Sequence, residues 1–262
     1  MVQKNYSFCI FLLFFTSICF SQSKNFKSFD DVKIVFSDEG EGEPVLLIHG
    51  FINSRKSWDN TQLKQDLLDK GYRVIVPDLR GNGDSDKPQD EEAYENDAEV
   101  KDLKLLMSHL NIKSYKAVGY SRGSIVLAKL LTTDKRIEKA VLGGMGIDFT
   151  NPDWDRRIMF AKAFDGEVNE TTKDAVDYAK SIYADLRSLH LQQKYQPVTS
   201  KKKLGKIKID VMVICGDEDL DNGNAKELSN AFVNGILVRV PGDHNGTYKT
   251  ADFSDEVLRF LL

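Results

Sequence analysis

One serine, Ser121, stands in a sequence context that could make it a nucleophile. It is the middle residue of Gly-Tyr-Ser-Arg-Gly at positions 119–123, after an apolar run and before helix-forming residues 125–131. At a sharp strand-to-helix turn, a serine hydroxyl is lifted out of the sheet, and the unpaired N–H groups of the helix N-terminus point at whatever binds there. Glycines on both sides suit such a turn, because a Cβ would collide with neighbouring backbone. The pattern by itself is unspecific, so its meaning depends on the rest of the chain.

A nucleophilic serine needs two partners, a base that takes its proton and an acid that orients the base. Of the four histidines, only His244 follows the last predicted strand. Acidic residues gather at positions 217–221, directly after another predicted strand. In open α/β sheets, ligands bind outside the carboxyl ends of the strands. We therefore expect Ser121, an acid of this cluster and His244 to meet at one edge of a sheet.

Alternating strands and helices must position these residues. The predicted strands after the first fall at residues 44–48, 72–76, 115–119, 137–142, 209–214 and 236–240. The predicted helices between and after them fall at residues 54–71, 91–110, 125–131, 225–232 and 252–262. Such alternation implies parallel βαβ units, and hence a doubly wound, mostly parallel α/β sheet with helices on both faces. Polar and apolar residues alternate within residues 29–42, which predicts an edge strand and a hairpin before this series.

The alternation is interrupted between residues 147 and 208, where no strand is predicted. Amphipathic helices are predicted around residues 154–164 and 173–189, so the segment is too ordered for a linker. We interpret residues 148–205, approximately, as a helical cap inserted over the sheet. Its large side chains could line a pocket, although for most of them a place in the cap's own core is the stronger expectation: Trp154, Met159, Phe160, Phe164, Tyr178 and Tyr183.

The composition limits which partners and cofactors are expected. The chain has 262 residues, of which 41% are hydrophobic and 29% charged, so residues 22–262 can form one domain with a sizeable core. The formal net charge of −4 leaves no basic surplus to neutralise phosphates, which excludes nucleic acid as an expected partner. The sequence holds no metal-ligand cluster and no dinucleotide or phosphate loop, so we expect neither metal nor cofactor and a small-molecule substrate. It does not specify an oligomeric state.

Residues 1–21 are predicted to be an export signal. Lys4 precedes an apolar run at residues 8–15, and small or polar residues follow, with Ser21 as the last residue before cleavage. The run is shorter than the about 20 residues that span a bilayer, so no stable membrane insertion is expected after cleavage. A lipid on Cys19 is the less favoured alternative, because bulky Ile18 stands where a small residue is expected. The prediction is an exported protein, periplasmic or secreted.

Five motifs in chain order give the sequence a resemblance to a known family. They lie at residues 47–51 (Leu-Ile-His-Gly-Phe), 78–85 (Asp-Leu-Arg-Gly-Asn-Gly-Asp-Ser), 119–123, 216–219 (Gly-Asp-Glu-Asp) and 242–244 (Gly-Asp-His). With these motifs the chain resembles the α/β-hydrolase family of serine-nucleophile, small-cap type, over essentially everything after the signal.

The resemblance implies a role for each site residue. Ser121 would be the nucleophile, His244 the general base and then acid, and Asp219 the orienting carboxylate, since the family's acid lies three residues after the glycine that closes its strand. Asp217 and Asp221 remain rivals for the acid.

The backbone N–H groups of Phe51 and Arg122 would form the oxyanion hole. His49, Asp78 and Arg80 would shape the loops around the site.

The leading hypothesis is an exported serine hydrolase that cleaves a small or medium acyl ester through an acyl-enzyme on Ser121, a carboxylesterase-like enzyme. A serine at this position argues against epoxide hydrolases and haloalkane dehalogenases of the same fold, which attack with aspartate. The alternatives within the fold are a carbon–carbon bond hydrolase, a lactonase and a peroxidase-like enzyme. A non-catalytic binding protein is less favoured, because such proteins usually lose a member of the triad.

Overall fold

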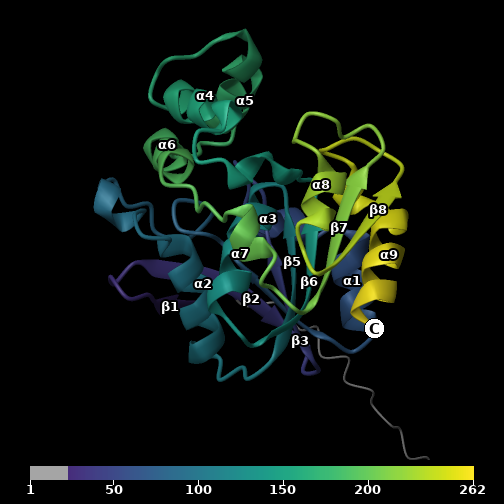
Figure 1. Cartoon of the computed structure of the whole chain (residues 1–262). Coiled ribbons are helices and arrows are strands. Elements are labelled where there is room, and N and C mark those ends of the chain that lie inside the picture. The colour runs from purple at the N-terminus through teal and green to yellow at the C-terminus, as the bar shows by residue number, and fades with distance from the viewer. Residues whose placement is uncertain (1–22) are drawn as a thin grey trace, which may run out of the picture.

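The computed structural model describes residues 23–262, and the predicted export signal at residues 1–21 lies outside them. Within the described part, the chain forms one eight-stranded sheet in the order β1-β2-β4-β3-β5-β6-β7-β8 (Figure 1). Pairing is antiparallel between β1 and β2 and between β2 and β4, and parallel elsewhere. The predicted doubly wound, mostly parallel α/β sheet is confirmed. Its strands are β1 (Lys24–Lys27), β2 (Lys33–Glu39), β3 (Pro44–Ile48), β4 (Arg73–Pro77), β5 (Tyr115–Tyr120), β6 (Ile137–Gly143), β7 (Asp210–Gly216) and β8 (Asn234–Val240).

The sheet begins differently from the sequence-based prediction. The strand predicted as an edge within residues 29–42 is β2, and it lies inside the sheet because β1 pairs along its outer side. Strand β1 has four residues and only one buried side chain, Phe26, so it carries no alternating pattern that could be recognised. A turn through Asp31, which has a φ of 62°, joins the two strands.

Helices cover both faces of the sheet (Figure 1). Helices α1 (Gln62–Asp69) and α9 (Ala251–Leu261) share one hydrophobic core, and α2 (Ala98–His109), α3 (Arg122–Thr133) and α8 (Ala225–Asn230) share the other. Neighbouring residues of a strand point to opposite faces, so Leu46 of β3 joins one core and Leu47 joins the other. This double burial explains the continuous apolar runs of the parallel strands.

Two predicted helices are shorter than expected. The helix predicted at residues 54–71 divides into the 3-10 turn η1 (Arg55–Trp58) and α1, which begins after the Thr61 cap. The helix predicted at residues 91–110 begins with the 3-10 turn η2 (Glu91–Ala93), and α2 starts only after Asn96 and Asp97, both with positive φ. A residue in the left-handed conformation cannot continue an α-helix. The spacing of apolar residues gives no sign of such a residue, so the predicted helices were too long.

The segment between β6 and β7 is helical. It contains η3 (Ile147–Thr150), α4 (Asp155–Phe164), α5 (Glu170–Ser181), α6 (Leu186–Lys194) and α7 (Lys201–Leu204). Figure 1 shows α4 and α5 set apart from the helices that cover the sheet. The single helix predicted at residues 173–189 is two helices, because Tyr183 takes a φ of 55° and Asp185 caps α6. By contrast with α4 and α5, α7 returns to the sheet, where Leu204 joins the core beside α3.

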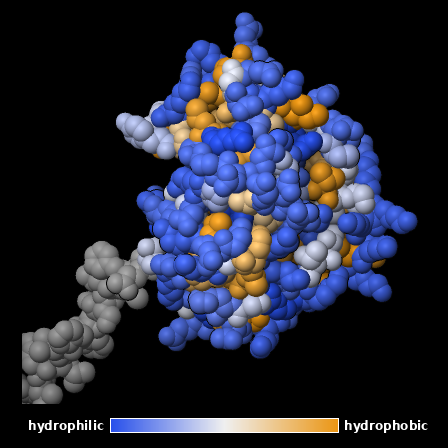
Figure 2. Space-filling view, turned by 90° about the vertical axis from the view of Figure 1, so that its left-hand side faces the viewer, coloured by the Kyte–Doolittle hydropathy of each residue, from blue (hydrophilic) through white to orange (hydrophobic). Residues whose placement is uncertain are grey.

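The face shown in Figure 2 is mostly hydrophilic, with apolar side chains in small separate patches. Among residues 23–262, no helix is long and apolar enough to cross a membrane.

Candidate active site

Ser121 sits in the strained turn between β5 and α3. Its φ is 54° and its ψ is −124°, a conformation that costs a non-glycine residue about 1–3 kcal/mol and persists only where the surroundings enforce it. Its N–H donates to the carbonyl of Gly143 at 2.8 Å. A Cβ on Gly119 would lie 2.5 Å from the Gly123 oxygen, and one on Gly123 would lie 2.3 Å from the oxygen of Ile48. Both flanking positions therefore require glycine.

His244 links the serine to an acid. Its Nε2 lies 2.9 Å from Ser121 Oγ, and its Nδ1 lies 2.8 Å from Oδ2 of Asp219. Asp219 follows β7 and His244 follows β8, so the carboxyl ends of β5, β7 and β8 deliver the three side chains to one point. A carboxylate can only accept hydrogen bonds, so the proton of neutral His244 is on Nδ1. Nε2 is then left with a lone pair facing the serine hydroxyl.

Asp219 is held in the ionised form. Its side chain is 2% exposed, and Oδ1 accepts a hydrogen bond from Asn222 Nδ2 at 2.9 Å. Burial opposes ionisation, but the hydrogen bonds and charge of His244 and the amide of Asn222 outweigh it, so the pKa of Asp219 lies below its ordinary value. Asn222 Nδ2 also lies 3.0 Å from His244 Nδ1, yet both atoms are donors in this arrangement, so that contact is not a hydrogen bond.

The two rival acids have other surroundings. Asp217 is exposed and accepts a hydrogen bond from the N–H of Gly242 at 2.9 Å. Asp221 is exposed as well, and within residues 23–262 it has no hydrogen bond to His244. Of the three candidates, Asp219 is thus the one that the structure brings to the histidine.

The two expected oxyanion donors lie beside the serine. A Cβ on Gly50 would be 3.2 Å from the Cβ of Ser121, so the loop that carries Phe51 runs against the nucleophile turn. Arg122 is the first residue of α3, where no intrahelical acceptor exists for its N–H. In the described part of the chain neither backbone N–H donates to an acceptor, so both are available to an anion.

The side chain of Arg122 has a separate, structural function. It is buried and binds both oxygens of Glu99 on α2, at 2.8 and 2.6 Å. Its Nη2 also donates to the carbonyl of Gln192 on α6, at 2.8 Å. The residue after the serine therefore joins the nucleophile turn to α2 and to α6. Nothing in the local sequence around Arg122 indicates these distant partners.

His49, Asp78 and Arg80 take part in the loops and do not contact Ser121. His49 Nδ1 donates to the oxygen of Gly50 at 2.8 Å, and Nε2 accepts from the N–H of Leu79 at 3.1 Å, so both ring nitrogens are engaged. Complete burial lowers the pKa of His49 and keeps it neutral. Asp78 binds Arg55, and Arg80 binds Asp102 and Asp30.

Tyr120, the residue before the serine, was not singled out by the sequence. Its hydroxyl donates to the backbone oxygen of His244 at 2.8 Å, and its ring centroid lies 5.6 Å from that of His244. Burial raises the pKa of Tyr120 and keeps it a donor. The tyrosine therefore positions the histidine loop against the serine turn.

The cap aromatics divide between packing and exposure. Phe164 and Phe160 of α4 pack edge-on against Phe51, with ring centroids 5.3 and 6.2 Å away. Tyr178 and Tyr183 are exposed. The expectation of a core role holds for Phe164, whereas the two tyrosines are among the residues that line a cavity, as the alternative expectation had it.

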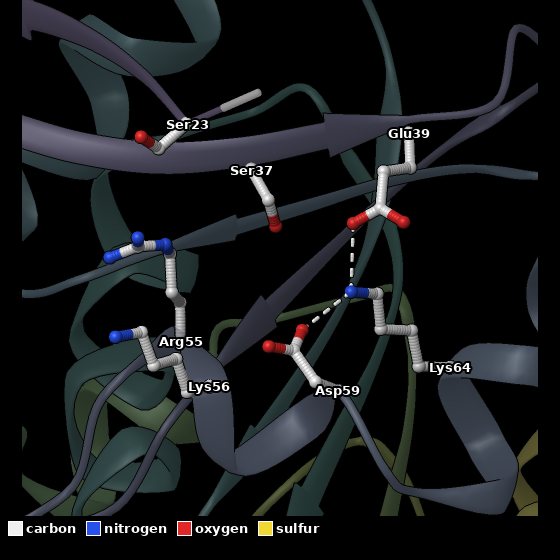
Figure 3. A pocket seen from close by; sticks show the side chains of 7 residues that line it. All are labelled: Ser23, Ser37, Glu39, Arg55, Lys56, Asp59 and Lys64. Atoms are coloured by element: carbon white, nitrogen blue, oxygen red, sulfur yellow. Dashed lines mark hydrogen bonds and ion pairs between the residues drawn. The ribbon is translucent and has the colours of Figure 1, made fainter. Parts of the chain in front are cut away.

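Two cavities lie near these elements. One, of about 390 Å³, opens between the α5–α6 connection and the loops after β3 and β4; Ile52, next to Phe51, is among its lining residues. The other, of about 350 Å³, lies between β2 and α1 (Figure 3). Figure 3 shows Lys64 bound to Glu39 and Asp59, both at 2.7 Å. Neither of these two cavities is lined by Ser121, Asp219 or His244.

Among residues 23–262, no three or more His, Cys, Asp or Glu side chains are grouped so that they could hold a metal ion. The site supplies a serine, a histidine and a carboxylate in hydrogen-bonded series, beside two N–H groups without an acceptor in the described part of the chain.

Comparison with known proteins shows which chains have a similar sequence. A family model for the alpha/beta hydrolase fold matches residues 43–173. The chain is 35% identical over 160 residues to 2-hydroxymuconate semialdehyde hydrolase from Pseudomonas sp., covering 55% of this chain and 56% of that protein. It is 33% identical over 117 residues to a non-heme haloperoxidase from Rhodococcus erythropolis, covering 44% and 41%. The matches thus span about half or less of these relatives.

Solved structures of other proteins superpose on most of this chain. An esterase from Exiguobacterium antarcticum superposes with a TM-score of 0.77 at 18% identity, covering 92% of this chain and 99% of that chain. The enol-lactonase from Burkholderia xenovorans superposes with a TM-score of 0.75 at 21% identity, covering 91% and 99%. At these identities the similarity concerns the fold alone.

Proposed function

The chain belongs to the α/β-hydrolase fold family, and from that premise we propose that it is a serine hydrolase, carboxylesterase-like, that cleaves a small or medium acyl ester through Ser121. The observation that carries the proposal is the unbroken series from Ser121 Oγ through His244 to Asp219, at 2.9 and 2.8 Å. The 390 Å³ cavity between the cap and the loop that carries Phe51 is within the size range of small-molecule sites.

The first half of the reaction transfers the acyl group to the enzyme. Ser121 Oγ attacks the ester carbonyl while His244 Nε2 takes the hydroxyl proton. The carbonyl oxygen becomes an anion, which the N–H groups of Phe51 and Arg122 stabilise. Ionised Asp219 stabilises the positive charge that forms on His244. The intermediate collapses, the imidazolium gives its proton to the departing alcohol, and an acyl-enzyme remains.

The second half returns the serine. A water molecule gives a proton to His244 Nε2 and attacks the acyl carbon, and the resulting oxyanion occupies the same N–H groups. Collapse breaks the bond to Ser121 Oγ, which recovers its proton from His244. The products are the carboxylic acid and the alcohol, and no further reactant is consumed.

Covalent labelling with a fluorophosphonate probe tests the nucleophile. Labelling is expected for the wild type and for the matched control Ser85→Ala. The native Ser85 hydroxyl donates to the backbone oxygen of Asp78 inside a loop. Labelling is expected to disappear in Ser121→Ala. Equal labelling of Ser121→Ala and wild type would refute the assignment. A panel of p-nitrophenyl esters of increasing chain length, with a lactone and a carbon–carbon bond substrate, then identifies the bond cleaved.

We further propose that the protein is exported, on the basis of the signal-like sequence at residues 1–21. Expression of the full chain should yield a shorter product outside the cytoplasm, whereas a chain starting at residue 22 should stay inside. An uncleaved full-length chain in the cytoplasm would argue against export.

A further inference from the structure

Arg156 on α4 is a partly buried guanidinium without a hydrogen-bonded or ionic partner among residues 23–262. Its neighbour Arg157 differs, because the guanidinium of Arg157 donates to the backbone oxygens of Lys194 and Pro152 and so ties α4 to the chain around it. Guanidinium groups removed from water are normally paired with carboxylates or carbonyls, so Arg156 has unused binding capacity.

The two acids whose charges act on Arg156 leave this capacity unfilled. Burial lowers the pKa of Arg156, and the charges of Asp221 and Asp219 only partly offset that effect. Asp219 already binds His244 and Asn222 with its two oxygens. Asp221 is exposed to solvent, which satisfies its carboxylate without the arginine.

Arg156 also lies at the site rather than on the outer surface of the cap. Its guanidinium carbon is 5.0 Å from the centre of the Phe160 ring. Phe160 in turn packs on Phe51, whose N–H is one of the two proposed oxyanion donors. The guanidinium therefore lies against the aromatic ring that contacts the oxyanion loop.

We propose that Arg156 binds a carboxylate carried by the substrate, so that the preferred esters are anionic. This inference rests on the proposed function, because it concerns the substrate of the same site. A planar guanidinium matches a carboxylate with two parallel hydrogen bonds, which a lysine cannot reproduce. The aromatic ring beside it limits hydration and strengthens the attraction.

Two matched pairs of esters test the proposal and cover both sides of the scissile bond. On the acyl side, the mono-p-nitrophenyl ester of glutaric acid is compared with p-nitrophenyl valerate, a neutral ester of equal chain length. On the alcohol side, para-acetoxybenzoate is compared with para-acetoxybenzamide. For each pair the ratio of kcat/KM, anionic over neutral, is measured in the wild type, Arg156→Gln, Arg156→Lys and Lys162→Gln. Lys162 is an exposed cation on the same helix and serves as the matched control.

The expected result is a ratio above one for at least one pair in the wild type. Loss of a charge-assisted hydrogen bond predicts a fall of about 10- to 100-fold in that ratio for Arg156→Gln, mainly through KM. Arg156→Lys should give an intermediate ratio, and Lys162→Gln should match the wild type. A merely structural role for Arg156 would change both esters of a pair alike.

Contrary results separate the two proposals. Neutral esters hydrolysed through Ser121, without anionic preference in either pair or with the preference kept in Arg156→Gln, would overturn the inference and leave the proposed function standing. Absence of Ser121 labelling and of turnover for all four esters would overturn both.

Discussion

Replacing Asp219 by asparagine places an amide between two fixed partners. In the native site, Oδ2 accepts the proton of His244 Nδ1 at 2.8 Å, and Oδ1 accepts from Asn222 Nδ2 at 2.9 Å. The amide of Asp219→Asn has one acceptor and one donor, so it cannot satisfy both. If its oxygen faces His244, its NH₂ opposes the NH₂ of Asn222. If its NH₂ faces His244, the imidazole must carry its proton on Nε2 and can no longer take one from Ser121.

The expected loss of activity follows from this conflict. A triad histidine held in the wrong tautomer typically costs about 10⁴-fold in kcat, which corresponds to about 5.4 kcal/mol in the transition state. Steady-state kinetics with a p-nitrophenyl ester should show that loss in kcat, with an unchanged circular dichroism spectrum. Asp217→Asn and Asp221→Asn are matched controls, since neither acid contacts His244, and each should retain activity within about threefold.

A second substitution tests the hydrogen-bond explanation itself. In Asp219→Asn/Asn222→Asp the new carboxylate at position 222 can accept from the asparagine at position 219, whose oxygen then faces His244. Asn222 Nδ2 already lies 3.0 Å from His244 Nδ1, so the new carboxylate can also bind the imidazole directly. The double variant should recover about tenfold or more in kcat. A single variant with a near-normal rate, or a double variant no faster than the single, would refute the reasoning.

Three further predictions concern the fold around the site. Because Ser121 has a φ of 54°, Ser121→Gly should be more stable than Ser121→Ala by about 1 kcal/mol in urea unfolding, and equal midpoints would show that the turn is not strained. Glu99→Gln leaves the buried Arg122 guanidinium without its counter-charge and should lower the free energy of unfolding by about 3 kcal/mol; a change under 1 kcal/mol would contradict the role given to this pair. Burial opposes ionisation of Asp38, but its hydrogen bonds to Arg73 and Lys24 keep its pKa below the ordinary value. The stabilisation by the ionised Asp38 is therefore present above about pH 4 and disappears as the pH falls through the lower, folded-state pKa. Asp38→Asn should therefore be less stable than wild type at pH 7, and the difference should shrink as the pH falls below about 4; a difference independent of pH would argue against the ion pair.

The order of strands and helices could be predicted because it depends on local patterns. Strands buried on both faces appear in the sequence as short apolar runs, and the helices between them appear as apolar residues repeated at helical spacing. Positive-φ residues at Asn96, Asp97 and Tyr183, which divide or shorten the helices, leave no such trace. Strand β1 was missed for a similar reason, since an edge strand with one buried residue has no pattern to recognise.

The sequence predicted which strand ends would meet at the candidate site, but not which side chains would contact each other there. Parallel strands bring their carboxyl ends together, so Ser121 and His244 could be placed from the strand order. The three aspartates within residues 217–221 could not be separated by strand order, because the path of the loop decides which one turns inward. The family resemblance favoured Asp219, and the structure places that residue against His244. Asn222 depends on the same loop path and had no signal of its own.

Arg122 shows why the remaining part of such a site lies beyond local sequence. Its backbone role follows from its position, because the first residue of a helix after a serine turn always has a free N–H. Its side-chain role depends on Glu99 on α2 and on the Gln192 carbonyl on α6, which are far away in the chain. The buried pair fixes the N-terminus of α3 against two other helices, so the oxyanion donor is held by contacts that its own motif does not contain. A serine motif therefore identifies the atoms that react, while the precision of their placement comes from tertiary packing.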